Sequence, residues 1–272
     1  DAEDTGGRSV AVGMQALSSQ NNDASNYNTA VGYNAGLSVT TGQYNTLIGG
    51  DAGDALTTGG SNVAIGYFAL SSEDAHGLNV AVGNRALGNQ NAGTNAYNTA
   101  VGNDAGLSVT TGVKNILIGG LAGDAITDAD GNAAMGHSAL SSNVLGSYSV
   151  AIGFRALNNQ NPVDGSGNAT AVDMYNTAIG TDAGTSVTVG TENTIIGALA
   201  GDALTNSDRN VALGSSALGA EILGQYSTAI GWNALGVQSN SSATNALNTA
   251  VGYNAGAAVS TGTQNTIMGG LA

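Results

Sequence analysis

Apolar and small residues recur along the chain in a fixed frame. Residues 28–36 read NTAVGYNAG, residues 9–17 read SVAVGMQAL, and residues 62–70 read NVAIGYFAL. The shared frame is Ser or Asn, Thr or Val, a small residue, Val or Ile, Gly, two variable residues, Ala, and then Leu or Gly. β-Branched residues alternate with small ones and a glycine follows, so each copy predicts a short β-strand that ends in a turn.

The frame glycine recurs fifteen times, most often at a spacing of 17 residues. Every fourth linker is longer, which places a super-repeat of about four copies over the basic period. We therefore predict an all-β fold, a parallel β-roll or β-solenoid of about fifteen 17-residue coils, forming a single domain over residues 1–272. The structural glycines of this frame are Gly13, Gly32, Gly49, Gly66, Gly83, Gly102, Gly119, Gly136, Gly153, Gly180, Gly197, Gly214, Gly231, Gly252 and Gly269.

Each coil is expected to contain two short strands and two faces. Residues 37–42 predict a second strand that ends at a glycine turn. In the first strand, alternation places Thr29 and Val31 on one face and Ala30 and Gly32 on the other. We expect the β-branched pair inside the coil and the Ala/Gly face against another backbone, which favours a homotrimer.

One coil in four carries a larger residue in place of the small one. Two interpretations remain open: these residues form apolar plugs between subunits, or they thicken the core of a single chain. They are Leu47, Leu117, Ile195 and Ile267.

Composition narrows the possible functions. The chain has 43 glycines among 272 residues, one proline, 9% charged residues and a net charge of −14. Five lysines and arginines are too few for a phosphate-binding surface, so nucleic acid is not an expected partner. Cysteine is absent, which excludes a disulfide framework and thiolate metal sites. No apolar run approaches the roughly 18 residues of a transmembrane helix, so membrane insertion is not expected either.

The frame resembles two families of surface fibre. SVAIG at 149–153 and its copies are similar to the head repeats of trimeric autotransporter adhesins (YadA-like), although the adhesin coils are shorter. The NTAVG pattern at 28–42 and 98–112 more closely resembles the repeat region of bacteriophage tail fibres. The resemblance implies a left-handed β-roll in a tight homotrimer, in an extracellular location on a virion tail fibre or a bacterial cell surface.

No residue pattern predicts an enzyme, a cofactor or a metal site. Asp54 and its equivalents Asp124 and Asp202 lie four coils apart, too far for shared calcium ligands. His76 and His137 have no second histidine at ligand spacing, so we interpret them as surface histidines. Nucleophile and phosphate-loop motifs are also absent.

Receptor contact is the remaining candidate activity. The position after each frame glycine varies freely, which predicts exposure, and Trp232 stands at one such position. The longest linker, residues 158–174, begins with four amide side chains that suit glycan hydroxyls: Asn158, Asn159, Gln160 and Asn161. Ordinary turn formation by the amides and plain packing of the aromatic are the alternatives.

We therefore expect a structural and adhesive fibre segment, the shaft or head of a phage tail fibre in host attachment. Its partners would be itself, as a homotrimer, and a host surface glycan or protein. We interpret the chain as a fragment of a longer fibre, because an open solenoid end exposes strand edges. One alternative is a bacterial trimeric surface adhesin. Another is a monomeric ice- or polysaccharide-binding solenoid, whose regular threonine array looks sparse because Thr29, Thr99, Thr177 and Thr249 recur only every fourth coil.

Overall fold

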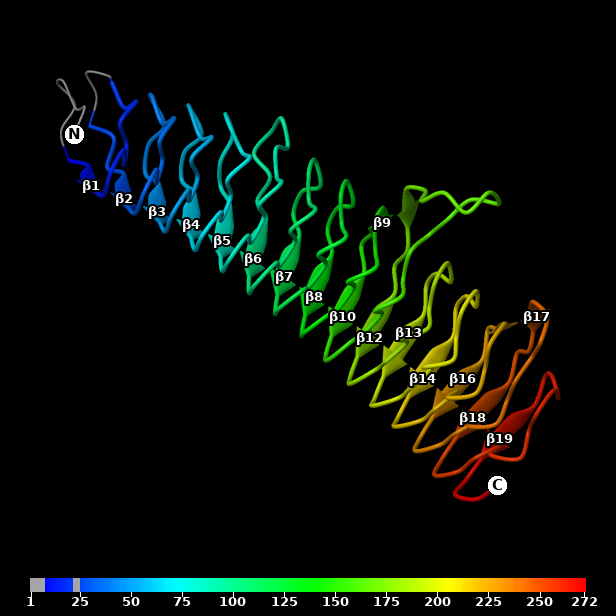
Figure 1. The fold of residues 1–272 in the computed structure, drawn as a ribbon. Coiled ribbons are helices and arrows are strands. Elements are labelled where there is room, and N and C mark those ends of the chain that lie inside the picture. Colours follow the sequence, from blue (N-terminus) through cyan, green and yellow to red (C-terminus); the bar gives the residue numbers. More distant parts are fainter. Residues whose placement is uncertain (1–7, 22–24) are drawn as a thin grey trace. The chain divides into compact units, whose positions relative to one another are not determined.

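The protein is a parallel β-solenoid of about fifteen turns of roughly 17 residues (Figure 1). A computed structural model describes residues 8–21 and 25–272, and within these ranges every regular element is a strand. The chain divides into two compact units, Asp1–Gly131 and Asn132–Ala272. Across the described residues, no helix has the length and apolar character needed to cross a membrane.

The first unit stacks one short parallel strand per coil. Each strand has three residues and pairs in register with the next, as in the alignment of Thr29, Ala30 and Val31 with Thr46, Leu47 and Ile48. The strands described in this unit are β1 (Val10–Val12), β2 (Thr29–Val31), β3 (Thr46–Ile48), β4 (Val63–Ile65), β5 (Val80–Val82), β6 (Thr99–Val101) and β7 (Ile116–Ile118).

The second unit repeats this stack and adds two small sheets, each pairing a strand of a 17-residue coil with a strand of the longer linker that follows it. Its stacked strands are β8 (Ala133–Met135), β10 (Val150–Ile152), β12 (Thr177–Ile179), β13 (Thr194–Ile196), β14 (Val211–Leu213), β16 (Thr228–Ile230), β18 (Thr249–Val251) and β19 (Thr266–Met268). The two small parallel sheets pair β9 (Gly146–Ser147) with β11 (Val172–Asp173), and β15 (Gly224–Gln225) with β17 (Thr244–Asn245).

The faces of the strands are the reverse of those expected from the sequence. Ala30 is fully buried inside its coil, whereas Val31 is 36% exposed and Thr29 is half-buried. The same inward middle residue recurs in the strands from β2 to β18 of the two stacks. The expectation of an Ala/Gly face between subunits was therefore wrong. In most coils an alanine of the strand points into the interior, where it packs with buried leucine, valine or isoleucine side chains, and the β-branched strand residues lie outside.

The bulky residues of every fourth coil thicken the core of the single chain. Leu47 and Leu117 are fully buried, which rules out their role as plugs between subunits. Glycine makes room for them: a Cβ on Gly36 would lie 2.7 Å from Leu47 Cδ1, and one on Gly53 would lie 2.8 Å from Leu47 Cδ2. In the next coil the inward strand residue is the small Ala64, and the position equivalent to Gly53 carries the buried Leu70. The four-coil super-repeat is thus a pattern of compensating volumes, as close packing requires.

The predicted second strand at residues 37–42 is not formed, and among the described residues the second half of a coil carries only the two-residue strands β9, β11, β15 and β17. Residues 37–42 form turns and bends that still bond to the next coil, as in Thr40 N donating to Thr57 O at 2.9 Å. Left-handed residues interrupt the extended backbone: Asn34 has a φ of 54° and Tyr44 a φ of 60°. Outside the two small sheets, these turns close each coil around its core without a second ladder.

The frame glycines are required by backbone stacking. Gly32 has a φ of 145°, and a Cβ there would lie 2.3 Å from the carbonyl oxygen of Gly49 in the next coil. Since no side chain can occupy that space, the repeat keeps glycine at this position.

The Ser/Asn position of the frame forms a buried ladder. In the first unit, Asn45 N donates to Asn28 Oδ1 at 2.8 Å, while Asn45 Nδ2 donates to Gly59 O at 2.9 Å. Each asparagine therefore links its strand to the preceding coil and to its own far turn. The ladder supplies partners for backbone groups that the turns would otherwise leave unpaired.

Candidate functional site

Three parts of the surface or near-surface structure could bind a partner: the outward strand side chains, the long loop at 158–174 and a His/Glu/Asp cluster. We call the first of these the outer face; it consists of the first and third residues of the three-residue strands. Its positions carry Val, Ile, Thr, Leu, Met and Ala and no charged residue. Exposure along it includes Ile48 at 37% and Leu213 at 40%.

Aromatic side chains flank the outer face. The residue before the ladder position is Tyr in several coils, and Tyr27 stacks on Tyr44 with ring centroids 5.5 Å apart. In the second unit Tyr148 stacks on Tyr175 at 5.7 Å. These tyrosines have left-handed backbone, with a φ of 54° at Tyr27. The flanks thus extend the apolar surface beyond the strand itself.

Trp232 lies on the opposite flank, after a frame glycine. It is 48% exposed and stacks on Tyr253 of the next coil, with centroids 5.1 Å apart and planes 14° apart. Other residues after frame glycines, including Met14, Tyr33 and Phe154, are also exposed. The expectation of exposure at this position is confirmed, and the ring pair offers a platform for an apolar or sugar surface.

The four amides at the start of the long loop have different environments. Gln160 is fully buried, with its Oε1 accepting from Asn176 Nδ2 at 3.0 Å and its Nε2 donating to Ser149 Oγ at 3.1 Å. Asn158 Nδ2 donates to Ser138 O at 3.0 Å and to Ser141 Oγ at 2.6 Å. Gln160 therefore belongs to the core, where it completes the ladder in a coil whose frame residue is serine.

Asn159 and Asn161 lie nearer the surface. Asn159 is exposed and Asn161 is half-buried. The exposed tip of the loop follows, where Val163 pairs with Ala169 in an antiparallel bridge. Within that tip, Asn168 N and Ser166 N donate to the Asp164 carboxylate and hold the pKa of this group below its usual range. The tip is a compact hairpin that carries one firmly ionised carboxylate.

The aspartates compared above with calcium repeats occupy partly buried turns. Burial raises the pKa of Asp54, and burial likewise raises the pKa of Asp202. Asp54 and Asp124 belong to the first unit and Asp202 to the second.

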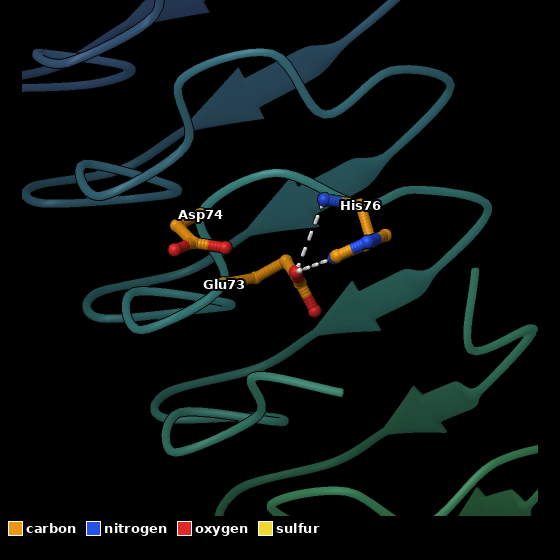
Figure 2. Close-up of side chains that lie close together, drawn as sticks. All are labelled: Glu73, Asp74 and His76. Atoms are coloured by element: carbon orange, nitrogen blue, oxygen red, sulfur yellow. Dashed lines mark hydrogen bonds and ion pairs between the residues drawn. The ribbon is translucent and has the colours of Figure 1, made fainter. Parts of the chain in front are cut away.

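A cluster that sequence reasoning missed lies in the turn after β4. Glu73, Asp74 and His76 offer ligand atoms that all lie within 4.8 Å of one another. Figure 2 shows the His76 ring beside the Glu73 carboxylate, with Asp74 on the same turn. Glu73 is fully buried and the His76 side chain is 31% exposed, so His76 lies at the surface with one edge against a buried carboxylate.

A polar groove adjoins this turn in the first unit. It has a volume of about 410 Å³, and Ala75 and Gly77 contribute to its lining together with Tyr44, Ser61 and Asn95. The Asn95 side chain is held there because its Oδ1 accepts from Gly77 N at 3.1 Å.

Comparison with protein-family models, with curated protein sequences and with solved structures gives no match to this chain.

Proposed function

We propose that the chain is a segment of a homotrimeric attachment fibre, in which three copies pack through their outer faces. The observation that supports this proposal is the uncharged, apolar outer face. Depletion of charge distinguishes the centre of a protein interface from the rest of a surface. The outer face replaces the Ala/Gly face as the contact between subunits.

The size of the surface agrees with stable association. Each coil adds about 4.8 Å along the stack, and the outer face with both flanking columns is roughly 20 Å wide. Over the seven or eight coils of one unit, this gives on the order of 700–800 Å² per subunit. In a trimer this area is divided between two neighbours, and the other unit carries a similar area, so each subunit would contribute on the order of 700–800 Å² to each neighbour, close to the roughly 800 Å² per partner of a standard interface. The resemblance to tail fibres and trimeric adhesins supports three-fold symmetry in this proposal.

Light scattering on the intact chain tests the proposal. We expect a mass three times the 26.4 kDa of one chain. Ile179→Lys with Ile230→Lys places two charges on the outer face and should lower the mass towards that of a monomer. Val163→Lys, on the loop tip, is the matched control and should leave the trimer intact. A folded wild-type chain that sediments and scatters as a monomer would refute the trimer.

Host attachment through the long loop is the adhesive part of the proposal. Removing residues 163–169 deletes the exposed hairpin and keeps Gln160 and Met174, which are buried. The shortened fibre should fold normally and bind host-surface glycans more weakly. Equal binding by parent and shortened fibre would make this segment a shaft rather than a receptor-binding region.

A second candidate is a monomeric solenoid that binds a regular lattice such as ice or a polysaccharide. The threonine array on the outer face is denser than expected, because Thr29 pairs with Thr46, Thr177 with Thr194, and Thr249 with both Thr228 and Thr266. A monomer would leave this array open to solvent. Thermal hysteresis or polysaccharide co-sedimentation by a monomeric chain would favour this candidate over the fibre.

A further inference from the structure

We propose that the turn formed by Glu73, Asp74 and His76 binds one divalent transition-metal ion, with Zn²⁺ as the representative of its class. His76 Nδ1 and one carboxylate oxygen each from Glu73 and Asp74 would be the protein ligands. This site is independent of the fibre function proposed above.

The first support is an unsatisfied buried nitrogen. His76 Nδ1 is inaccessible to solvent and has no hydrogen-bond partner, while Glu73 Oε1 lies 3.7 Å away. That separation is too long for a hydrogen bond. Two ligands of one tetrahedral zinc ion lie about 3.4 Å apart, because their bonds to the metal are about 2.0–2.2 Å long. A small movement of the imidazole ring would therefore bring both atoms to ligand distance.

The second support is a buried carboxylate with few partners. Glu73 accepts from His76 N at 3.2 Å and from Gln90 Nε2 at 3.1 Å. A fully buried carboxylate is stable only when it is well hydrogen-bonded, paired or coordinated to a metal. A cation beside Glu73 would supply the missing compensation.

Equivalent turns of the same chain provide an internal comparison. The ladder identifies them, because Asn62, Asn132 and Asn210 donate through Nδ2 to the carbonyl oxygens of residues 76, 146 and 224 respectively. In the third turn, Glu221 accepts from the backbone N–H groups of residues 222, 223, 224 and 240 and from the amides of Gln238 and Asn240. The saturated Glu221 has Ile222 and Gly224 where the first turn has Asp74 and His76.

The second turn gives the same contrast. Asn143 replaces the buried glutamate and accepts from Gly146 N at 3.0 Å through Oδ1. Val144 and Gly146 stand at the positions of Asp74 and His76. Both potential ligands therefore appear only in the turn whose buried carboxylate lacks its full set of donors.

The backbone of the candidate site is already fixed by hydrogen bonds from the preceding coil and from its own coil. Thr57 donates through N and Oγ1 to Asp74 O, at 2.6 and 3.0 Å, and Asn62 Nδ2 donates to His76 O at 3.3 Å. Preorganised ligands lower the ordering cost of binding. A mixed nitrogen and oxygen set favours zinc-type ions over Ca²⁺ and Mg²⁺, which take oxygen ligands.

Titration of the untagged, metal-free chain with ZnCl₂ tests the proposal by calorimetry and by thermal melting, each with and without EDTA. We expect one ion per chain and a Zn²⁺-dependent rise in melting temperature. Co²⁺ substitution should produce visible absorption bands typical of low coordination number, because the site offers three protein ligands.

Two variants copy the equivalent turns and should therefore fold. His76→Gly introduces the residue found at 146 and 224, and Asp74→Val introduces the residue found at 144; each should weaken Zn²⁺ binding at least tenfold. His137→Ala removes the other histidine and should leave binding unchanged. Absence of saturable binding, or equal binding by His76→Gly and the parent chain, would overturn the proposal and identify any bound zinc as adventitious.

Discussion

At the scale of single residues, asparagine at the ladder position is fully hydrogen-bonded in one coil and leaves a buried amide unpaired in another. Asn193 Nδ2 donates to Ser207 O at 2.7 Å and its Oδ1 accepts from Asn210 N at 2.9 Å. Asn79 Oδ1 accepts from Asn98 N at 3.1 Å, but Asn79 Nδ2 is buried without a partner. In later copies of the super-repeat, Ser149 and Ser227 stand at the position equivalent to Asn79.

We predict opposite effects for the same substitution at these two positions. Asn193→Ser should lower the free energy of unfolding by about 1–3 kcal/mol, because a buried carbonyl loses its donor. Asn79→Ser should leave it unchanged or raise it by up to about 1 kcal/mol, because an unpaired buried amide is removed. Urea unfolding measures both, with Asn159→Ala as an exposed control. Equal losses at 79 and 193 would contradict the ladder's role.

A second prediction concerns the buried carboxylate of Glu221. Burial alone would raise its pKa, but hydrogen bonds from Asn240 N, Gln238 Nε2 and Gly224 N outweigh burial and lower the pKa. A carboxyl group whose pKa is lower in the folded state stabilises the fold above its unfolded pKa of about 4.3, and this stabilisation is lost as the pH falls. Glu221→Gln should therefore cost about 1.5–3 kcal/mol at pH 7 and progressively less below pH 4 or so.

Asp202 is the control for that pH dependence, because its pKa shifts in the opposite direction to that of Glu221. Burial raises the pKa of Asp202, so folding favours its protonated form and its charge opposes folding at neutral pH. Asp202→Asn should raise the melting temperature at pH 7 and have little effect at pH 3. Parallel pH profiles for the variants at 221 and 202 would show that these hydrogen bonds do not set the stability.

At the scale of elements, the coil core is a set of matched large and small positions. Gly184 follows β12, has a φ of 57°, and a Cβ there would lie 2.9 Å from Ile195 Cδ1 in β13. Other coils reverse the sizes, with Ala151 in β10 and the buried Leu157 after it. The two positions therefore share one volume.

We predict strong coupling between residues 184 and 195. Gly184→Leu should cost about 1–3 kcal/mol from overcrowding, in addition to about 1–2 kcal/mol for a left-handed side-chain residue. Ile195→Ala should cost about 2–5 kcal/mol through a cavity. The double variant should be more stable than the sum of the two losses by about 0.5–3 kcal/mol, because leucine fills the vacated volume. Denaturant unfolding of the parent, the two single variants and the double variant measures this coupling energy. Strictly additive losses would disprove the shared volume.

The sequence predicted the period, the parallel stacking and the place of each first strand, because Gly32 and its copies mark each coil. It failed on the direction of the strand faces. Thr29 and Val31 suit a core as well as a surface, and only the closed coil shows that they point outward while Ala30 points inward. The second strand was also wrong, since left-handed residues such as Tyr44 are not recognisable from residue type.

The candidate sites were harder to predict than the fold. The burial of Glu73 depends on Gln90, 17 residues later, whose own place depends on coil closure. Gln160 looked like a surface amide because its linker is polar, yet the linker folds back to complete the ladder. Side chains that meet only through stacking leave no local signal in the sequence.

At the scale of the whole molecule, the matched volumes predict which deletions the solenoid tolerates. Deleting residues 153–230 removes four coils of the second unit and joins Ile152 to Gly231, which restores every large and small pairing. Deleting residues 180–196 removes one coil, and Gly201 then faces the space that Ile195 filled. The shorter deletion should lower the melting temperature more than the longer one, as thermal unfolding by circular dichroism can measure. The reverse order would mean that coil number, rather than coil sequence, controls stability.

The compensating pattern of Leu47, Gly36 and Gly53 has a genetic consequence. Unequal crossing-over between misaligned copies is tolerated only when the exchanged block spans four coils, since other exchanges leave mismatched cores. Lineages that carry this repeat can therefore change its reach only in steps of about 19 Å, four times the spacing between parallel strands. The same glycine and leucine positions that pack the interior thus restrict the lengths that evolution can reach.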